Sequence, residues 1–344
     1  MRYRIFGNTG LRVSTLALGT GNFGKGWGYG SDQDEARRIY TTYREAGGNF
    51  IDTADQYQFG QSEAMLGEFI AGERDDIVLA TKVSLGDAPD AGLQRSGNSR
   101  KAMLRSVEAS LKRLNTDRVD LLWVHMPDGV TPMDEIARGL DDLVRSGKIL
   151  YAGLSDFPAW RIATAVTLAE ARGWSPVAAV QLEYSLVERS AERELLPMSA
   201  GFNLGTVAWS PLGGGLLTGK YRRGETGRAQ GLGVVIHDES DARKTATVDA
   251  VLAIADEIGA SPGQVAIAWV LAKGILPIIG PRTHEQLIDN LASLDVKLST
   301  EHLQRLDAVS AIKLGFPHDV VAETAPALAG GKLELIDWPR TAVR

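Results

Sequence analysis

Short apolar runs alternate with longer amphipathic stretches along most of this chain. Each apolar run is about as long as one β-strand, and together they occupy residues 14–20, 49–54, 76–83, 119–125, 149–155, 178–184, 203–209 and 275–280. The runs are nearly continuous rather than alternating in polarity, which is typical of parallel strands that helices cover on the outside. The pattern therefore predicts eight such strands.

The stretches between the runs carry apolar residues at helical spacing. They occupy residues 33–47, 61–73, 98–114, 133–147, 158–173, 188–200 and 245–259. Asn98 and Ser99 are predicted to cap the third of these helices, and Gly147 and Gly259 stand where helices are expected to stop. Eight strands that alternate with helices predict an α/β fold, a closed (β/α)8 TIM barrel, more readily than an open doubly wound sheet.

Three segments depart from this alternation. Residues 1–14 contain a Gly-rich turn between two alternating segments and predict a β-hairpin. Residues 211–244 form a long, Gly-rich and charged connection after the seventh strand, a length that is uncommon unless the loop is functional or mobile. Residues 310–344 form a C-terminal tail that includes Trp338 and could fold over the mouth of the barrel. Because no linker composition interrupts the chain, residues 1–344 are predicted to be a single domain.

Composition narrows the class of protein. The 344 residues are 44% hydrophobic and 23% charged, with a net charge of −6 and no basic stripe, so nucleic acid is not an expected partner. The absence of cysteine excludes disulfides, Cys-ligated clusters and thiolate catalysis. No apolar run approaches the ~18 residues of a membrane span, and the N-terminus lacks a secretory apolar region. We expect a cytoplasmic protein, and an oligomer is compatible with the sequence.

Four polar residues stand at or just after the C-terminal ends of predicted strands: Asp52, Tyr57, Lys82 and His125. In a barrel of this kind, such ends converge on one face. A free phenol titrates near ~10. An ammonium group beside it favours the phenolate and lowers the phenol's pKa, while a carboxylate keeps that ammonium charged. The four together predict proton transfer to or from a carbonyl or an alcohol. Taken singly, each has a structural alternative: a helix cap, a rim aromatic, a paired buried lysine or a satisfied core histidine.

Several motifs in register resemble one enzyme superfamily, the aldo-keto reductases. They are LALGTGNFG, FIDTADQYQFGQSEAMLGE, LATK, RLNTDRVDLLWVHMPD, YAGLSDF, VQLEYSL, AWSPLGGGLLTGKY and IIGPRTHEQLIDNL. The resemblance runs from about residue 5 to residue 310. It is closest to the bacterial aryl-alcohol dehydrogenase-like and potassium-channel β-subunit-like reductases.

The resemblance implies roles for the four residues. Tyr57 would be the general acid in carbonyl reduction and the general base in alcohol oxidation. Lys82, paired with Asp52, would depress the pKa of that tyrosine, and His125 would hydrogen-bond the reacting oxygen. The hydride would come from the cofactor, so the reaction needs no metal.

The resemblance also implies an NADPH (NADP+) site that does not use a Rossmann glycine motif, with NADH as an alternative. The implied contacts are Ser155, Asp156 and Gln181 for the carboxamide, Tyr184 stacked on the nicotinamide, Ser210, Leu212 and Lys220 for the phosphates, Gly280, Arg282, Gln286 and Asn290 for the adenosine half, and Gly19, Thr20, Asn22 and Asp52 around them. A guanidinium at Arg282 suits a 2′-phosphate and favours NADPH. Asp156 stands where many relatives have Asn, and an ionised carboxylate can accept from the carboxamide but cannot donate.

Residues in two loops are predicted to face the substrate beside Tyr57 and His125. They are Trp27, Tyr29, Met126 and Asp128, and the alternative for each is ordinary loop packing. An aromatic cavity would favour aromatic or bulky carbonyls and the corresponding alcohols. The leading hypothesis is thus a reversible NADPH-dependent reductase of aldehydes and ketones. The alternatives are a nucleotide-sensing regulatory subunit with slow turnover, and an NAD-linked alcohol or sugar dehydrogenase.

Overall fold

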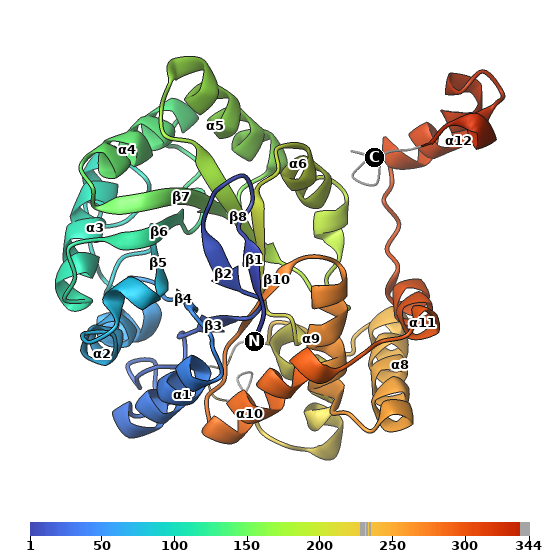
Figure 1. Cartoon of the computed structure of the whole chain (residues 1–344), viewed down its shortest axis with the longest axis horizontal. Coiled ribbons are helices and arrows are strands. Elements are labelled where there is room, and N and C mark those ends of the chain that lie inside the picture. The colour runs from blue at the N-terminus through green and yellow to red at the C-terminus, as the bar shows by residue number, and fades with distance from the viewer. Residues whose placement is uncertain (228–230, 232, 234, 338–344) are drawn as a thin grey trace.

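A closed barrel of eight parallel strands forms the centre of the protein (Figure 1). The computed structural model describes residues 1–227, 231, 233 and 235–337. The barrel strands are β3 (Ala17–Gly19), β4 (Phe50–Asp52), β5 (Val78–Val83), β6 (Val119–Val124), β7 (Ile149–Ser155), β8 (Val177–Glu183), β9 (Gly205–Trp209) and β10 (Leu276–Ile279). They pair in the order β10-β3-β4-β5-β6-β7-β8-β9, which confirms the predicted (β/α)8 barrel.

Helices surround the barrel on the outside (Figure 1). They are α1 (Gln33–Glu45), α2 (Gln61–Phe69), α3 (Arg100–Arg113), α4 (Met133–Arg145), α5 (Ala159–Arg172), α6 (Leu195–Gly201), α8 (Ala242–Ile258), α9 (Pro262–Ala272), α10 (His284–Ala292) and α11 (Thr300–Ser310). Ser99, rather than Asn98, caps α3 with its side chain. The predicted helix over 188–200 is shorter, because Pro197 lacks an N–H and is tolerated only in a first turn, so α6 begins at Leu195.

The N-terminal hairpin closes the end of the barrel opposite to the C-terminal strand ends. Strands β1 (Tyr3–Ile5) and β2 (Arg12–Ser14) pair antiparallel, as predicted, and lie across the barrel in Figure 1. Phe6 follows β1 and is 1% exposed, with its ring edge-on to Phe50 at 5.5 Å. A residue with a side chain could not replace Gly7, since its φ is +58° and a Cβ there would lie 2.4 Å from the Gly205 nitrogen.

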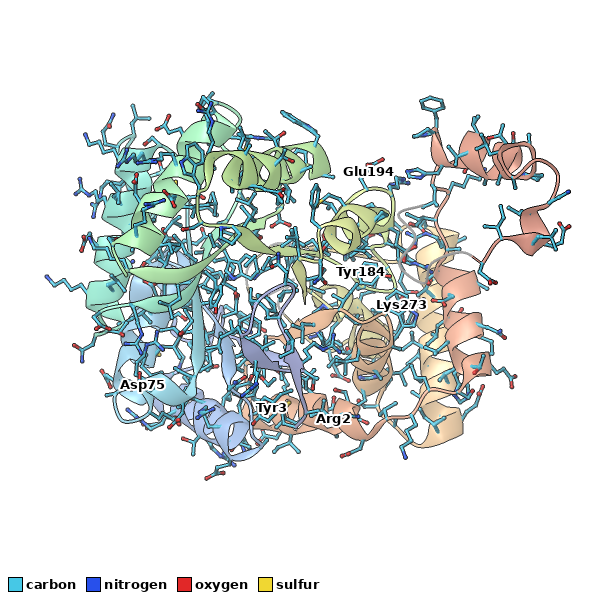
Figure 2. All side chains as sticks on the ribbon, turned by 45° about the horizontal axis from the view of Figure 1, so that its top comes forward. Arg2, Tyr3, Asp75, Tyr184, Glu194 and Lys273 are labelled. Atoms are coloured by element: carbon cyan, nitrogen blue, oxygen red, sulfur yellow. The ribbon has the colours of Figure 1, made fainter. Side chains whose placement is uncertain are left out.

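The C-terminal segment stands away from the barrel (Figure 1). Arg193 donates to the carbonyls of Lys313 and Leu314, which leads the chain outward along the α6 side. There His318 lies 3.5 Å from Glu194, which Figure 2 labels beside this segment. Helix α12 (His318–Leu328) has no buried residue, so the described part of the tail does not cover the barrel mouth. Trp338 lies outside the described residues.

The predicted long connection after the seventh strand contains two short 3-10 turns, Gly213–Thr218 and Lys220–Arg223, before α8 begins. The first turn follows β9 directly and lies at the C-terminal end of the barrel. Among the described residues, no helix combines the length and apolar character needed to cross a membrane.

Candidate active site

A cavity of about 620 Å³ opens at the C-terminal ends of the barrel strands. Most of the residues predicted from the sequence contribute to its wall. These are Gly19, Asn22, Trp27, Tyr29, Asp52, Tyr57, His125, Met126, Asp156, Gln181, Ser210, Leu212, Lys220, Gly280, Arg282, Gln286 and Asn290. Lys82 lies directly beneath, because its side chain is fully buried and reaches both Asp52 and Tyr57.

Lys82 and Asp52 form a buried ion pair at the base of the cavity. The Lys82 ammonium donates to an Asp52 carboxylate oxygen, to the Thr53 carbonyl at 3.0 Å and to the Tyr57 hydroxyl at 3.1 Å. Burial alone would lower the pKa of Lys82, but the charges of Asp52 and Tyr57 and their hydrogen bonds raise it above its ordinary value. Lys82 is therefore a permanent cation whose three protons are all directed.

Two residues that the sequence analysis did not connect with this ion pair hold the other oxygen of the Asp52 carboxylate. Trp123 donates its indole N–H at 3.0 Å and Gln181 its amide at 2.9 Å. Trp123 lies on β6 and points into the barrel. In the sequence it stands within an apolar run, which indicates only a core residue. Gln181 is thus already engaged in orienting Asp52, while it also lines the cavity where the carboxamide was predicted.

Tyr57 is held by a strained turn. Gln58 and Phe59, the next two residues, have φ of 53° and 55°, in a region that residues with side chains rarely occupy. The buried Gln58 side chain donates to the carbonyls of Gly21 and Tyr29 and accepts from the Trp27 N–H at 2.9 Å. Trp27 lies edge-on to the Tyr57 ring at 6.0 Å. Gln58 therefore connects the first loop of the barrel to the tyrosine.

His125 faces Tyr57 from a buried position. Its ring lies edge-on to Tyr57 at 6.1 Å and the residue is 7% exposed. Burial, with a smaller contribution from Lys82, lowers the pKa of His125 to about 3, so the imidazole is neutral near pH 7. Among the described residues, its Nδ1 has no hydrogen-bond partner. A neutral imidazole can donate to or accept from a polar atom in the cavity.

The next section of the cavity is formed by Asp156 and Trp209. Asp156, at φ +58°, accepts from the Trp209 indole N–H at 3.0 Å and from Ser155 Oγ at 3.1 Å. Burial raises the pKa of Asp156 to about 6 despite these hydrogen bonds, so the carboxyl can also donate below that pH. Trp209 ends β9 and lines the cavity, although the sequence analysis did not single it out.

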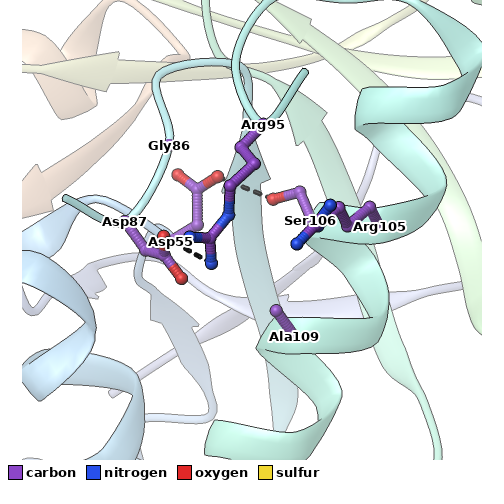
Figure 3. Close-up of a pocket in the computed structure, with 7 residues that line it drawn as sticks. All are labelled: Asp55, Gly86, Asp87, Arg95, Arg105, Ser106 and Ala109. Atoms are coloured by element: carbon purple, nitrogen blue, oxygen red, sulfur yellow. Dashed lines mark hydrogen bonds and ion pairs between the residues drawn. The ribbon is translucent and has the colours of Figure 1, made fainter. Parts of the chain in front are cut away.

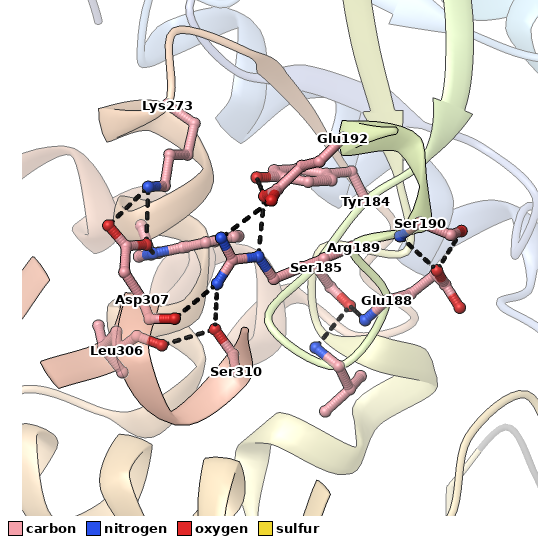
Figure 4. A network of polar contacts seen from close by, with 12 residues as sticks. Tyr184, Ser185, Glu188, Arg189, Ser190, Glu192, Lys273, Leu306, Asp307 and Ser310 are labelled. Atoms are coloured by element: carbon pink, nitrogen blue, oxygen red, sulfur yellow. Dashed lines mark hydrogen bonds and ion pairs between the residues drawn. The ribbon is translucent and has the colours of Figure 1, made fainter. Parts of the chain in front are cut away.

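Tyr184 is placed elsewhere, which corrects its predicted stacking role. Its ring stacks on Trp269 at 5.2 Å and its hydroxyl donates to Glu192 at 2.5 Å, within the polar network of Figure 4. Tyr184 is three positions after Gln181, and side chains an odd number of positions apart along an extended chain point to opposite faces. That spacing was the signal in the sequence: Gln181 faces the barrel interior and Tyr184 the helices.

Three other predicted residues do not line the cavity. Thr20 is buried and bonds to the Asp52 carbonyl and to Ser62, and Ser155 reaches the site only through Asp156. Asp128, predicted to face substrate, instead accepts from Thr131 and from backbone amides. Burial would raise the pKa of Asp128, but these hydrogen bonds lower it to about 2. Its role is loop packing, the alternative given above.

The far end of the cavity is rich in cations. Lys220, Arg223 and Arg282 line it, and Arg223 is paired with Glu225, which also lines the cavity. Burial is the main reason that the pKa of Lys220 is lowered. Arg282 lies over the Tyr29 ring at 5.0 Å, and its Nε is buried without a partner among the described residues. Asn22 donates to the Gly280 carbonyl at 2.9 Å, which joins the first barrel loop to the last.

One cavity thus carries an unpartnered imidazole nitrogen near Tyr57 and an unpartnered guanidinium nitrogen near Lys220. Buried polar atoms in proteins are usually satisfied, so both indicate positions for ligand atoms. A long anionic ligand with a polar ring at one end and phosphates at the other fits this donor set, as a nicotinamide dinucleotide does.

Asp55 lies in the loop that carries Tyr57 and was not singled out from the sequence. Its backbone N–H donates to the Lys82 carbonyl, and its carboxylate accepts from Ser106 Oγ at 2.7 Å (Figure 3). Its other oxygen has no partner among the described residues and borders a small cavity of about 20 Å³. Burial raises the pKa of Asp55 to about 7.

Comparisons with known proteins identify the family of this chain. The aldo/keto reductase family model matches residues 15–311. The chain is 37% identical over 329 residues to norsolorinic acid reductase of Aspergillus flavus, which covers 92% of this chain and 83% of that protein. It is 39% identical over 320 residues to the uncharacterized oxidoreductase YrpG of Bacillus subtilis, which covers 90% and 96%.

A third relative carries a cofactor in its name. The chain is 35% identical over 332 residues to an aryl-alcohol dehydrogenase (NADP(+)) of Phanerodontia chrysosporium, which covers 90% of this chain and 86% of that protein. The family match spans the whole barrel, and the relatives cover nearly the full chain. This chain therefore belongs to the aldo/keto reductase family, in its aryl-alcohol dehydrogenase-like subgroup, and is an NAD(P)H-dependent oxidoreductase.

Proposed function

We propose that this protein reduces aromatic or bulky aldehydes and ketones with NADPH, and oxidises the corresponding alcohols in reverse. The observation that carries the proposal is the Tyr57 hydroxyl, which lies 3.1 Å from the Lys82 ammonium and faces a neutral His125 across one cavity. Bound NADPH supplies the hydride to the carbonyl carbon. The residues of the chain supply the proton and the geometry.

Each catalytic residue has a distinct task in the proposal. The substrate oxygen accepts hydrogen bonds from the Tyr57 hydroxyl and from the neutral His125 imidazole. As the oxygen gains negative charge, Tyr57 transfers its proton, and the charge left on the phenolate faces Lys82 at 3.1 Å. Asp52 keeps the ammonium in place, and Trp123 and Gln181 keep Asp52 in place. A positioned proton donor of this type contributes ~10²–10⁴-fold to the rate.

The cofactor preference rests on the cationic end of the cavity. Arg282 presents an unpartnered buried Nε beside Lys220 and Arg223, a set that favours the 2′-phosphate of NADPH over a ribose diol. Trp209 would stack beside the nicotinamide, and Asp156 and Gln181 would hold the carboxamide, since all three line the cavity. The printed name of the Phanerodontia chrysosporium relative points to the same cofactor.

The proposed substrate class rests on the residues around Tyr57 and His125, at the opposite end of the cavity. Trp27 and Met126 flank Tyr57 and His125, and an aromatic ring and a thioether are favourable neighbours for an aryl group. The protein should be assayed with a panel of aromatic, bulky alicyclic and short aliphatic aldehydes, with NADPH and with NADH. The expected result is many turnovers, highest kcat/KM for aryl aldehydes and a preference for NADPH. A single slow turnover with tightly bound NADPH would instead indicate a nucleotide-sensing role, and a strong NADH preference would overturn the cofactor proposal.

A further inference from the structure

Few contacts of its own hold the His125 side chain in place. Its Nδ1 has no partner among the described residues, and the ring contact with Tyr57 is an edge-on aromatic contact at 6.1 Å. Histidines in active sites are usually oriented by a hydrogen bond at the second ring nitrogen. Here the position of the imidazole must follow from the backbone that carries it, so the groups that fix this backbone matter for the reaction.

Besides the strand pairing of the barrel, a buried amide supports that backbone, directly after His125 and through Ser84 at His125 itself. Asn98 is 0% exposed, and its Nδ2 donates to the carbonyl of Met126, the residue after His125, at 2.7 Å. Its Oδ1 accepts from Ser84 Oγ at 2.6 Å. The His125 N–H is shared, since it donates to the Val83 carbonyl at 2.9 Å, where β6 runs beside β5, and also to Ser84 Oγ at 3.2 Å. The direction of these bonds is consistent, because the Met126 carbonyl can only accept and the His125 N–H can only donate.

The backbone at Asn98 also joins two loops. The Asn98 N–H donates to Asp128 at 2.8 Å, and the Gly97 N–H donates to the Ser84 carbonyl at 2.7 Å. Ser84 has a φ of 141°, a backbone conformation that is unfavourable for a residue with a side chain. Strain of this kind persists only where surrounding contacts enforce it, and it concentrates at functional sites.

We infer that Asn98 is a positioning residue: its side-chain amide brackets the backbone of His125 and sets where the imidazole meets the substrate oxygen. This inference rests on the proposed function of His125. Asn98 contacts neither the cavity nor the other three catalytic residues, so its effect passes through His125 and Met126. A helix cap, which the sequence suggested for Asn98 together with Ser99, is supplied by Ser99 alone.

The neighbouring residue provides a matched control. Asn98→Ala leaves the Ser84 hydroxyl and the Met126 carbonyl without their partner, whereas Ser99→Ala removes the α3 cap and leaves the bracket intact. We expect Asn98→Ala to lower kcat for aryl aldehyde reduction by about 10–100-fold, the scale of a small misplacement of a catalytic group. NADPH affinity, measured by fluorescence quenching, should stay within about 2-fold. Ser99→Ala should lower the unfolding midpoint and leave kcat unchanged.

A spectroscopic readout separates positioning from loss of stability. In ¹⁵N-histidine NMR spectra of the full chain, assigned with a His125→Ala variant, the His125 ring resonances should shift or broaden in Asn98→Ala and not in Ser99→Ala. The inference is overturned if Asn98→Ala lowers the unfolding midpoint while kcat and the His125 resonances stay as in the parent. If His125→Ala itself keeps full turnover, the proposed catalytic role of His125 fails, and the NMR comparison still decides whether Asn98 positions the ring.

Discussion

The two ends of the cavity are built on different physical principles. At the catalytic end, the Lys82 and Asp52 side chains are 0% and 2% exposed, and each hydrogen-bonds to several groups. At the cationic end, Lys220 and Arg282 are half-buried and Arg223 is exposed, and Arg282 retains an unpartnered Nε. The buried ion pair at the first end is complete without a ligand, whereas the guanidinium at the second end retains a nitrogen that a ligand would partner.

Because of this difference, substitutions at the catalytic end should change the reaction rate, and substitutions at the cationic end should change cofactor affinity. A buried, fully bonded group contributes to folding as well as to catalysis, so its replacement should alter both. A half-exposed cation contributes to ligand binding and little to folding, and its effect should be screened by salt. Substitutions at the two ends therefore test whether the division holds.

The largest effect is expected at the proton donor. Tyr57→Phe removes the hydroxyl that faces Lys82 and should lower kcat for aldehyde reduction by about 10²–10⁴-fold, with NADPH affinity nearly unchanged. Steady-state kinetics and NADPH fluorescence titration measure the two quantities. Tyr3→Phe, in the hairpin at the other end of the barrel, is the matched control and should keep parent activity. Full activity in Tyr57→Phe would show that another group donates the proton.

The ion pair beneath Tyr57 should show the coupling to stability. Lys82→Met leaves the Asp52 carboxylate buried without a countercharge and should lower the free energy of unfolding by about 3–5 kcal/mol. Urea denaturation measures the change. The double variant Asp52→Asn with Lys82→Met should recover part of it, and Lys220→Met at the cationic end should change stability by less than about 0.5 kcal/mol. Equal losses of unfolding free energy in Lys82→Met and Lys220→Met would contradict the comparison.

Asp55, in the loop that carries Tyr57, should make the stability of the protein depend on pH. Its pKa is raised to about 7 in the folded protein, whereas a free Asp titrates near ~3.9. Between these values the folded chain keeps a proton that the unfolded chain has lost, so stability falls as the pH rises through this window. Asp55→Asn should flatten the slope and add about 2–4 kcal/mol to the free energy of unfolding at pH 8. Denaturation at pH 5, 6, 7 and 8 tests this, and an unchanged slope would refute the assignment.

The smallest effect is expected at the cationic end. Arg282→Met should weaken NADPH binding by about 10–100-fold, the scale of one charge-assisted hydrogen bond, and NADH binding by less than about 3-fold. Stability and kcat at saturating NADPH should stay close to the parent. Isothermal titration at two salt concentrations measures both the affinity and its screening. Equal weakening for the two cofactors would place Arg282 away from the 2′-phosphate.

The proximity of Asp52, Tyr57, Lys82 and His125 was predictable because each residue stands at or just after the end of an apolar run. Strand ends of a parallel barrel meet on one face, so position along the chain translated directly into proximity. The contacts of Trp123, Gln58 and Asn98 were not predicted, because their side-chain partners lie at least 14 residues away in sequence and their own local patterns indicate only core, loop and cap. The stacking role predicted for Tyr184 was wrong, because its odd spacing from Gln181 turns the side chain away from the barrel interior.

What the sequence determined by itself is the barrel and the family to which the chain belongs. Apolar runs at regular spacing specify local elements, and burying them on both faces leaves few ways to close the sheet. Only the tertiary structure decided how the site is held: which oxygen of Asp52 meets Lys82, which indole lies beside Asp156, and which buried amide supports His125. Such contacts join strands and loops far apart in the chain, and their hydrogen-bond geometry exists only once the barrel has closed.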